Sequence, residues 1–121
     1  MYRLIFYRDR KGREPVAEYL ADLGKRSDKD SRVKYNKIRD YMHALSSYGT
    51  TIGAPYVKHI DGDIWELRPL RDRIFFVTWI NGSFILLHHF MKKTQKTPAR
   101  EIEKAKKEVA DIKERGGWYE L

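Results

Sequence analysis

The sequence KHIDGDIWELRPLRDRIFFVTWINGSFILLHHFMKKTQKTP, residues 58–98, decides the fold. It contains three apolar runs typical of β-strands, at 64–67, 74–80 and 84–91. Asn81-Gly82 separates the last two runs, and this pair favours a type I′ turn because both central positions of that turn need a positive φ. The sequence therefore predicts that the last two strands are antiparallel neighbours.

The residues before this stretch predict one strand and two helices. An alternating, aromatic-rich run at 2–7 indicates a first strand. Pro15 suits the first turn of a helix, and Gly24 is expected to end that helix. Ser27 opens a capping-box pattern, Ser-x-x-Asp, so a second helix is expected to begin there and to end near Tyr48. Two helices joined by a short connection predict a helix hairpin that covers one face of the sheet.

The residues after the last strand predict a third helix. Thr97 is expected to be its N-cap and Pro98 its first residue, and one narrow apolar stripe runs along it to Gly116. The central strands are apolar at nearly every position, so both faces of the sheet should be covered. The expected fold class is α+β: a small, mostly antiparallel sheet with an N-terminal helix hairpin and a C-terminal helix. Residues 1–121 are expected to form a single domain.

Composition narrows the class of protein. The chain has no cysteine, which excludes disulfides and thiolate metal ligands and favours a reducing cytoplasm. Its first residues are not expected to form a signal peptide or a membrane span, because their apolar run is short and charges come early. A net charge of +8 and a pI of about 9.7 point to phosphate backbones or an acidic protein as partner. The alternative is a cationic surface without a dedicated ligand.

Basic residues and histidines gather at the expected strand ends, which suggests a polyanion site. They are Lys58, His59, Arg68, Arg71, Arg73, His88, His89, Lys92, Lys93 and Lys96.

Other catalytic motifs are missing from the sequence. Adjacent residues in a strand point to opposite faces, so His88 and His89 cannot chelate one metal together. The Asp61-Gly62-Asp63 run indicates a turn rather than a carboxylate pair. Metal-free RNA cleavage needs a base, cations beside the phosphate and an acid, and the basic and imidazole groups supply these types. His88 and His89 are open to two interpretations, because one of them faces the side of Phe84, Leu86 and Phe90 and is either a core histidine or a proton-transfer group.

Three segments together resemble the HigB-type, phage-derived branch of the RelE/ParE toxin superfamily. They are Ile-Trp-Glu-Leu-Arg at 64–68, Arg-Ile-Phe-Phe at 73–76, and Ile-Leu-Leu-His-His-Phe-Met-Lys-Lys-Thr-Gln-Lys-Thr-Pro at 85–98, followed by Glu101-Ile102. The similarity extends over nearly the whole chain.

This resemblance implies a RelE-like α+β toxin of a type II toxin-antitoxin module, acting in the cytoplasm as a ribosome-dependent mRNA endonuclease in the 30S A site. Such toxins cut mRNA by attack of a 2′-hydroxyl, without metal or other cofactor. The implied partner is a HigA-like antitoxin with a helix-turn-helix domain, and operator DNA is contacted only through that antitoxin. The antitoxin would use either an acidic segment or a structured domain.

The resemblance also implies residue roles. Arg68 and Arg73 correspond to arginines that grip the scissile phosphate, and His88 occupies a position where this branch often has histidine. Either His88 or His59 would exchange the proton. The full candidate sets are, for catalysis, Arg68, Arg73, His88 and Lys93, and for RNA binding, Lys58, His59, Arg71, Lys92 and Lys96.

Two other functions stay open on the sequence alone. ParE-type members of the same superfamily inhibit DNA gyrase without cutting nucleic acid, and a basic interaction module without toxicity would also fit the charge. Tyr119 is an unaligned counterpart of a C-terminal tyrosine that RelE-like enzymes place near the active site. The Trp118-Tyr119 tail either docks on the sheet or stays loose.

Overall fold

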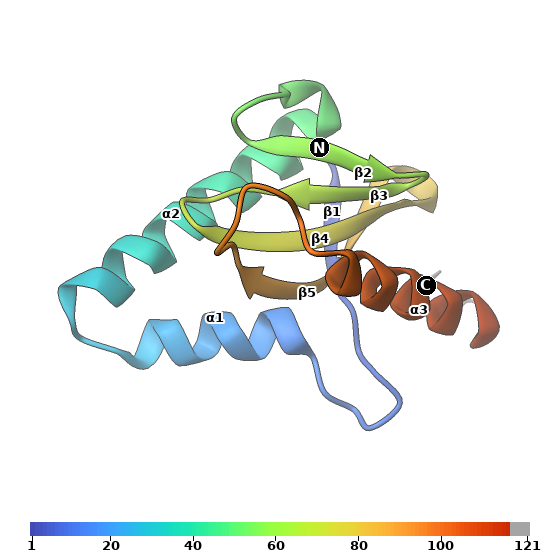
Figure 1. Ribbon diagram of the computed structural model, residues 1–121, viewed down its shortest axis with the longest axis horizontal. Helices are drawn as coiled ribbons and strands as arrows, with labels where there is room; N and C mark the ends of the chain where they lie inside the picture. The colour runs from blue at the N-terminus through green and yellow to red at the C-terminus, as the bar shows by residue number, and fades with distance from the viewer. Residues whose placement is uncertain (117–121) are drawn as a thin grey trace.

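The computed structural model describes residues 1–116, which form a five-stranded sheet and three α-helices (Figure 1). The strand order is β1-β5-β4-β3-β2. The strands are β1 (Arg3–Phe6), β2 (Val57–Asp61), β3 (Ile64–Leu67), β4 (Asp72–Trp79) and β5 (Ser83–Met91). The helices are α1 (Pro15–Lys25), α2 (Lys29–Tyr48) and α3 (Ala99–Glu114), with short 3-10 turns at Gly49–Ile52 and Ile80–Gly82.

The sheet is mostly antiparallel, as predicted. β2, β3, β4 and β5 form three antiparallel pairs in succession, and β1 adds a parallel edge beside β5. Asn81 and Gly82 have φ values of 55° and 66°, so both turn positions lie in the left-handed region as expected. Because Trp79 pairs with Ser83, Ile80 also belongs to the turn.

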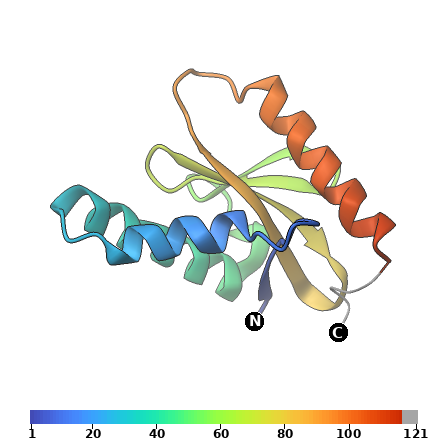
Figure 2. The same cartoon turned by 90° about the horizontal axis from the view of Figure 1, so that it is seen from below.

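Helices cover both faces of the sheet, which explains why its central strands are apolar throughout (Figure 2). On one face, α1 and α2 bury Val16, Leu23, Ile38 and Leu45 against the strands. On the other face, α3 packs Ala105 and Ile112 against a second cluster that includes Phe75 and Leu87. The predicted helix hairpin and C-terminal helix are confirmed.

Two expected helix ends are corrected by the structure. Gly24 lies inside α1, directly before its last residue Lys25, and it lacks the positive φ of a helix-ending glycine. A Cβ atom there would be in ordinary van der Waals contact with the Tyr35 ring, 3.5 Å away. Asp28, not Ser27, caps α2, because its carboxylate accepts a hydrogen bond from the Ser31 amide at 3.0 Å. Asp and Ser are comparable caps, so the two candidates could not be separated from the sequence.

The start of α3 and one strand also differ from expectation. α3 begins at Ala99 with Pro98 as its N-cap, and the Thr97 hydroxyl donates instead to Glu66, 31 residues away. The edge strand β2 was not predicted, because the sequence Val-Lys-His-Ile-Asp does not alternate between apolar and polar residues. The structure agrees with this weak pattern, since Val57 is buried while Lys58 and His59 are both exposed.

The predictions for Trp118 and Tyr119 lie outside the described residues. Within residues 1–116, no helix combines the length and the apolar character that crossing a membrane requires.

Candidate functional site

A basic pocket lies at one corner of the sheet, on the face that α3 packs against. Arg73 pairs with Phe90 across β4 and β5, and it lies two residues before Phe75 in the cluster beneath α3. Since side chains alternate along a strand, Arg73 points to the α3 face. The segment that leaves β5 runs across this face before α3 begins (Figure 1). Its residues Lys92, Lys93, Thr94 and Gln95 line an open pocket together with residues from the start of β4.

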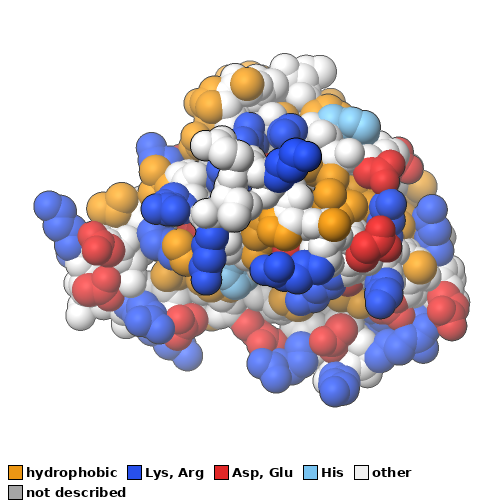
Figure 3. All heavy atoms as spheres, in the orientation of Figure 1, with side chains coloured by type: hydrophobic (Ala, Val, Ile, Leu, Met, Phe, Trp, Pro, Cys, Tyr) orange, Lys and Arg blue, Asp and Glu red, His pale blue; other side chains and the backbone are white. Residues whose placement is uncertain are grey.

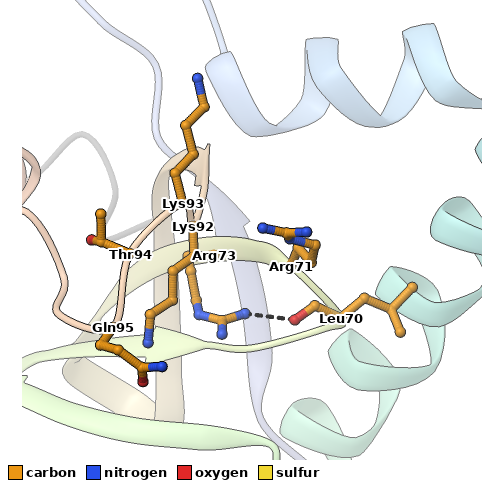
Figure 4. Close-up of a pocket in the computed structure, with 7 residues that line it drawn as sticks. All are labelled: Leu70, Arg71, Arg73, Lys92, Lys93, Thr94 and Gln95. Atoms are coloured by element: carbon orange, nitrogen blue, oxygen red, sulfur yellow. Dashed lines mark hydrogen bonds between the residues drawn. The ribbon is translucent and has the colours of Figure 1, made fainter.

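The pocket has a volume of about 400 Å³. Its wall combines the β3–β4 connection, the start of β4 and the segment after β5 (Figure 4). The lining residues are Leu70, Arg71, Arg73, Lys92, Lys93, Thr94 and Gln95. Four of the seven are cations, and Figure 3 shows Lys and Arg side chains gathered around the loop between β5 and α3. Such a pocket is suited to an anion.

Arg73 is held firmly at the base of this pocket. Its side chain is 10% exposed, and its Nη1 donates to the carbonyls of Leu70 and Asp72, each at 2.8 Å. Its Nε has no hydrogen-bond partner among the described residues. Two backbone carbonyls therefore fix the guanidinium while part of its donor capacity is unused.

Glu66 is a fully buried carboxylate that lies close to Arg68 and Arg73 and is hydrogen-bonded to the segment between β5 and α3. Its Oε1 is 3.4 Å from Arg68 Nε and 3.7 Å from Arg73 Nε, and its Oε2 accepts from the Thr97 hydroxyl at 3.0 Å. One negative charge thus lies between two guanidinium groups. A buried carboxylate without such partners would be costly, so the two arginines offset part of the cost of burying Glu66.

The cations of the pocket perturb one another. Burial lowers the pKa of Arg73, and the Glu66 carboxylate opposes this change. Loss of hydration lowers the pKa of the Lys92 ammonium, and the positive charges of Arg73 and Arg68 lower it further. Lys58 acts on Lys92 in the same direction. Because like charges are held together, a bound anion would relieve their repulsion.

The structure brings together most of the basic residues singled out from the sequence. Arg71, Arg73, Lys92 and Lys93 line the pocket, although Lys93 extends away from the side where Lys92 and Arg73 lie (Figure 4). Arg68 adjoins the pocket through Glu66, and Lys58 pairs with Glu66 across β2 and β3. Lys96 is exposed in the same segment as Lys93 but does not line the pocket.

His88 does not line the pocket and is packed beneath α3. Its side chain is 2% exposed; its Nδ1 lies 2.5 Å from Glu108 Oε1 and its Nε2 lies 3.0 Å from Glu101 Oε1. A bulge leaves Leu87 without a partner in β4, so His88 faces α3 with Phe90 rather than sharing a face with Phe84 and Leu86, as strict alternation had suggested. The core-histidine interpretation describes this environment.

The other two central histidines are also placed apart from the pocket. The His89 ring stacks on Tyr19 of α1 with centroids 3.6 Å apart, so it lies on the face opposite His88. His59 donates from Nε2 to the Gly62 carbonyl at 2.7 Å and meets the Trp65 ring edge-on. Both contacts are structural. Within residues 1–116, no three His, Asp or Glu side chains gather in a way that could hold a metal ion.

Sequence reasoning missed Glu66, Leu70, Thr94, Gln95 and Thr97. Glu66 could have been found from the sequence, because it is a lone acidic residue in an apolar strand. It lies two residues before Arg68, so the two side chains share one face of the strand and can pair. The remaining four have no local pattern that distinguishes them from ordinary loop residues.

A known protein family matches most of this chain. The sequence profile of the family described as Phage derived protein Gp49-like matches residues 22–110, from the end of α1 into α3. This range includes every residue of the pocket. The chain belongs to the phage-derived Gp49-like family. This family is known as one of RelE-like toxins of type II toxin-antitoxin modules, and it implies an antitoxin partner. A search of curated proteins found no match.

Proposed function

We propose that this Gp49-like chain is a HigB-like mRNA endonuclease that acts on the translating ribosome. The observation that carries the proposal is Arg73, a nearly buried guanidinium fixed by two carbonyls beside Lys92 in an otherwise open pocket. Oriented donors of this kind stabilise negative charge that develops during a reaction, because they need no reorganisation.

The proposed reaction is transfer within the RNA chain. The 2′-oxygen attacks the neighbouring phosphorus, the bond from phosphorus to the 5′-oxygen breaks, and the 2′-proton passes to solvent. Arg73 and Arg68 stabilise the charge on the pentavalent phosphorus. Lys92 donates a proton to the departing 5′-oxygen, which suits an ammonium whose pKa is lowered. The products are a 2′,3′-cyclic phosphate and a 5′-hydroxyl.

The remaining cations are proposed to hold the flanking RNA. Arg71 and Lys93 line the pocket, whereas Lys58 and Lys96 lie beside it, and contacts of this type position a nucleic acid without reading its sequence. His88 is assigned to support of α3, because both of its ring nitrogens already face carboxylates. His59 is assigned to the β2–β3 turn.

The proposed setting is that of a toxin-antitoxin module in the bacterial cytoplasm. A HigA-like antitoxin with a helix-turn-helix domain neutralises the chain, and the complex meets operator DNA through the antitoxin. This assignment rests on the family and on the likeness of residues 85–98 to HigB-type toxins.

The test compares Arg73→Ala and Arg73→Lys with Arg100→Ala, a variant of an arginine that is 81% exposed on α3. Loss of an oriented donor is expected to reduce mRNA cleavage about 100-fold to 1000-fold in both Arg73 variants, since lysine cannot reproduce the guanidinium fork. Arg100→Ala should cleave normally.

Circular dichroism and urea unfolding check that each variant is folded. A folded Arg73→Ala protein with full cleavage would contradict the assigned role. In growing cells, DNA breaks that precede any arrest of translation would instead favour inhibition of gyrase.

A further inference from the structure

An apolar groove adjoins the basic pocket. The described part of the chain exposes six large apolar side chains, and three of them gather here from separate elements. Val33 of α2, Leu70 of the β3–β4 connection and Met91 of β5 are 48%, 48% and 47% exposed. The groove has a volume of about 300 Å³, and its other lining residues are Asp30, Lys34, Arg71 and Asp72. Convergence of exposed apolar side chains marks an interaction site more often than scattered ones do.

Leu70 has an unusual conformation at the centre of this region. Its φ is +55°, a value that glycine and asparagine adopt readily and leucine rarely. The turn directs the Leu70 carbonyl to Arg73, yet the side chain lies half in solvent, where it contributes little to the core. A large apolar residue held in this way is better explained by a contact with a partner.

The groove and the basic pocket are continuous. Leu70 and Arg71 line both, so an occupant of the groove lies at the mouth of the pocket. Lys34 is engaged with Asp72, 3.5 Å away, and lies over the Tyr19 ring. The cations that an incoming partner meets next are therefore Arg71 and the lysines of the pocket. The surface therefore consists of an apolar groove with a positively charged pocket beside it.

We propose that the antitoxin docks in this groove and thereby closes the basic pocket. An apolar side chain of the antitoxin lies among Val33, Leu70 and Met91, and adjacent acidic side chains reach Arg71 and Lys92. The positive charge of the adjoining pocket supports an acidic protein segment, since the two acids and two bases that line the groove balance one another. RNA is a poorer occupant because none of the described residues that line the groove has an aromatic ring on which a base could stack. This inference rests on the proposed function only in taking the partner to be an antitoxin.

The test uses Val33→Glu, because Val33 lines the groove but not the pocket and lies exposed on α2, where glutamate is well tolerated. Ile80→Glu is the matched control: Ile80 is 46% exposed at the β4–β5 turn, at the opposite end of β4 from the groove. The probe is the purified product of the open reading frame beside the toxin gene. Calorimetry measures its dissociation constant, and a separate assay measures inhibition of translation by each toxin variant alone.

Val33→Glu is expected to inhibit translation like the wild type but to bind the antitoxin at least 10-fold more weakly. Val33→Lys should lose less affinity, since it removes apolar area without repelling acidic groups. Ile80→Glu should change neither quantity. Antitoxin binding by Val33→Glu within twofold of the wild type would overturn the proposal.

Two further outcomes are informative. A wild-type chain that dimerises on its own, when Val33→Glu does not, would assign the groove to a second copy and overturn the proposal. If the wild type fails to inhibit translation, the proposed function fails, while the binding data still decide whether the groove is the docking site.

Discussion

Replacing Glu66 with glutamine tests how the basic pocket is assembled. The substitution keeps the volume and a hydrogen-bond acceptor for Thr97, but it removes the negative charge between Arg68 and Arg73. Two cations would then lie side by side without compensation, one of them 27% exposed and the other 10% exposed. We expect both stability and catalysis to fall.

The magnitude follows from the geometry. At 3.4 Å and 3.7 Å, each ion contact is worth about 4.5–5 kcal/mol before hydration is considered. In the unfolded chain the Glu66 carboxylate is hydrated, which offsets several kcal/mol of this attraction. Water around the partly exposed Arg68 also weakens the contact between Arg68 and Glu66. Removing one partner of a buried pair generally costs about 3–5 kcal/mol, and because glutamine leaves no cavity we expect about 3 kcal/mol. For a chain of this length, that loss lowers the Tm by about 12 °C.

Urea unfolding measures the effect, with an unchanged slope as evidence that the folded state is intact. Glu103→Gln is the matched control, because Glu103 is 65% exposed and lies 3.8 Å from Lys106. It should change the free energy of unfolding by less than about 0.5 kcal/mol. A Glu66→Gln protein that loses less than about 1 kcal/mol of unfolding free energy and cleaves mRNA at the wild-type rate would contradict this role of Glu66.

Three more predictions concern the surroundings of the pocket. Thr97→Val should lower the free energy of unfolding by about 1.5 kcal/mol, because it leaves an oxygen of the buried Glu66 carboxylate without its hydrogen bond. Amide hydrogen exchange in residues 92–98 should become faster, and unchanged exchange would count against Thr97 as the residue that holds this segment. NMR titration should find the pKa of Lys92 below its usual value in the wild type and higher in Arg73→Ala, and an identical pKa in both proteins would exclude the coupling. Because the ammonium loses its charge above its pKa, the affinity for phosphate should fall as pH rises through that pKa. His88→Leu should destabilise the fold by about 3 kcal/mol by stranding Glu108, yet folded protein should still cleave; a stable but inactive variant would restore a catalytic role.

Local signals in the sequence predict much of the fold. Apolar runs and the Asn81-Gly82 pair specify β3, β4 and β5, because strand patterning and turn geometry depend on neighbouring residues. The missed strand β2 is an edge strand whose pairing with β3 outweighs its weak pattern. The parallel pairing of β1 with β5 joins residues about 80 positions apart, and no local feature encodes it.

The sequence predicts which basic residues gather at the candidate site, but not the long-range contacts that hold them in place. Strand ends placed Arg73 and Lys92 near each other, since β4 and β5 are hairpin neighbours. The partners of Glu66 and His88 come from the segment before α3 and from α3 itself, so the sequence gives no indication of how they meet. The role of His88 therefore depended on the position of α3 and on the bulge in β5.

Ribosome-dependent cleavage of mRNA can be observed by adding the purified wild-type protein to a cell-free translation reaction and mapping new 5′ ends of the reporter mRNA. We expect cuts that appear only on mRNA being translated, that carry 5′-hydroxyl ends and that disappear with Arg73→Ala. Intact mRNA in the presence of folded wild-type protein would contradict this expectation.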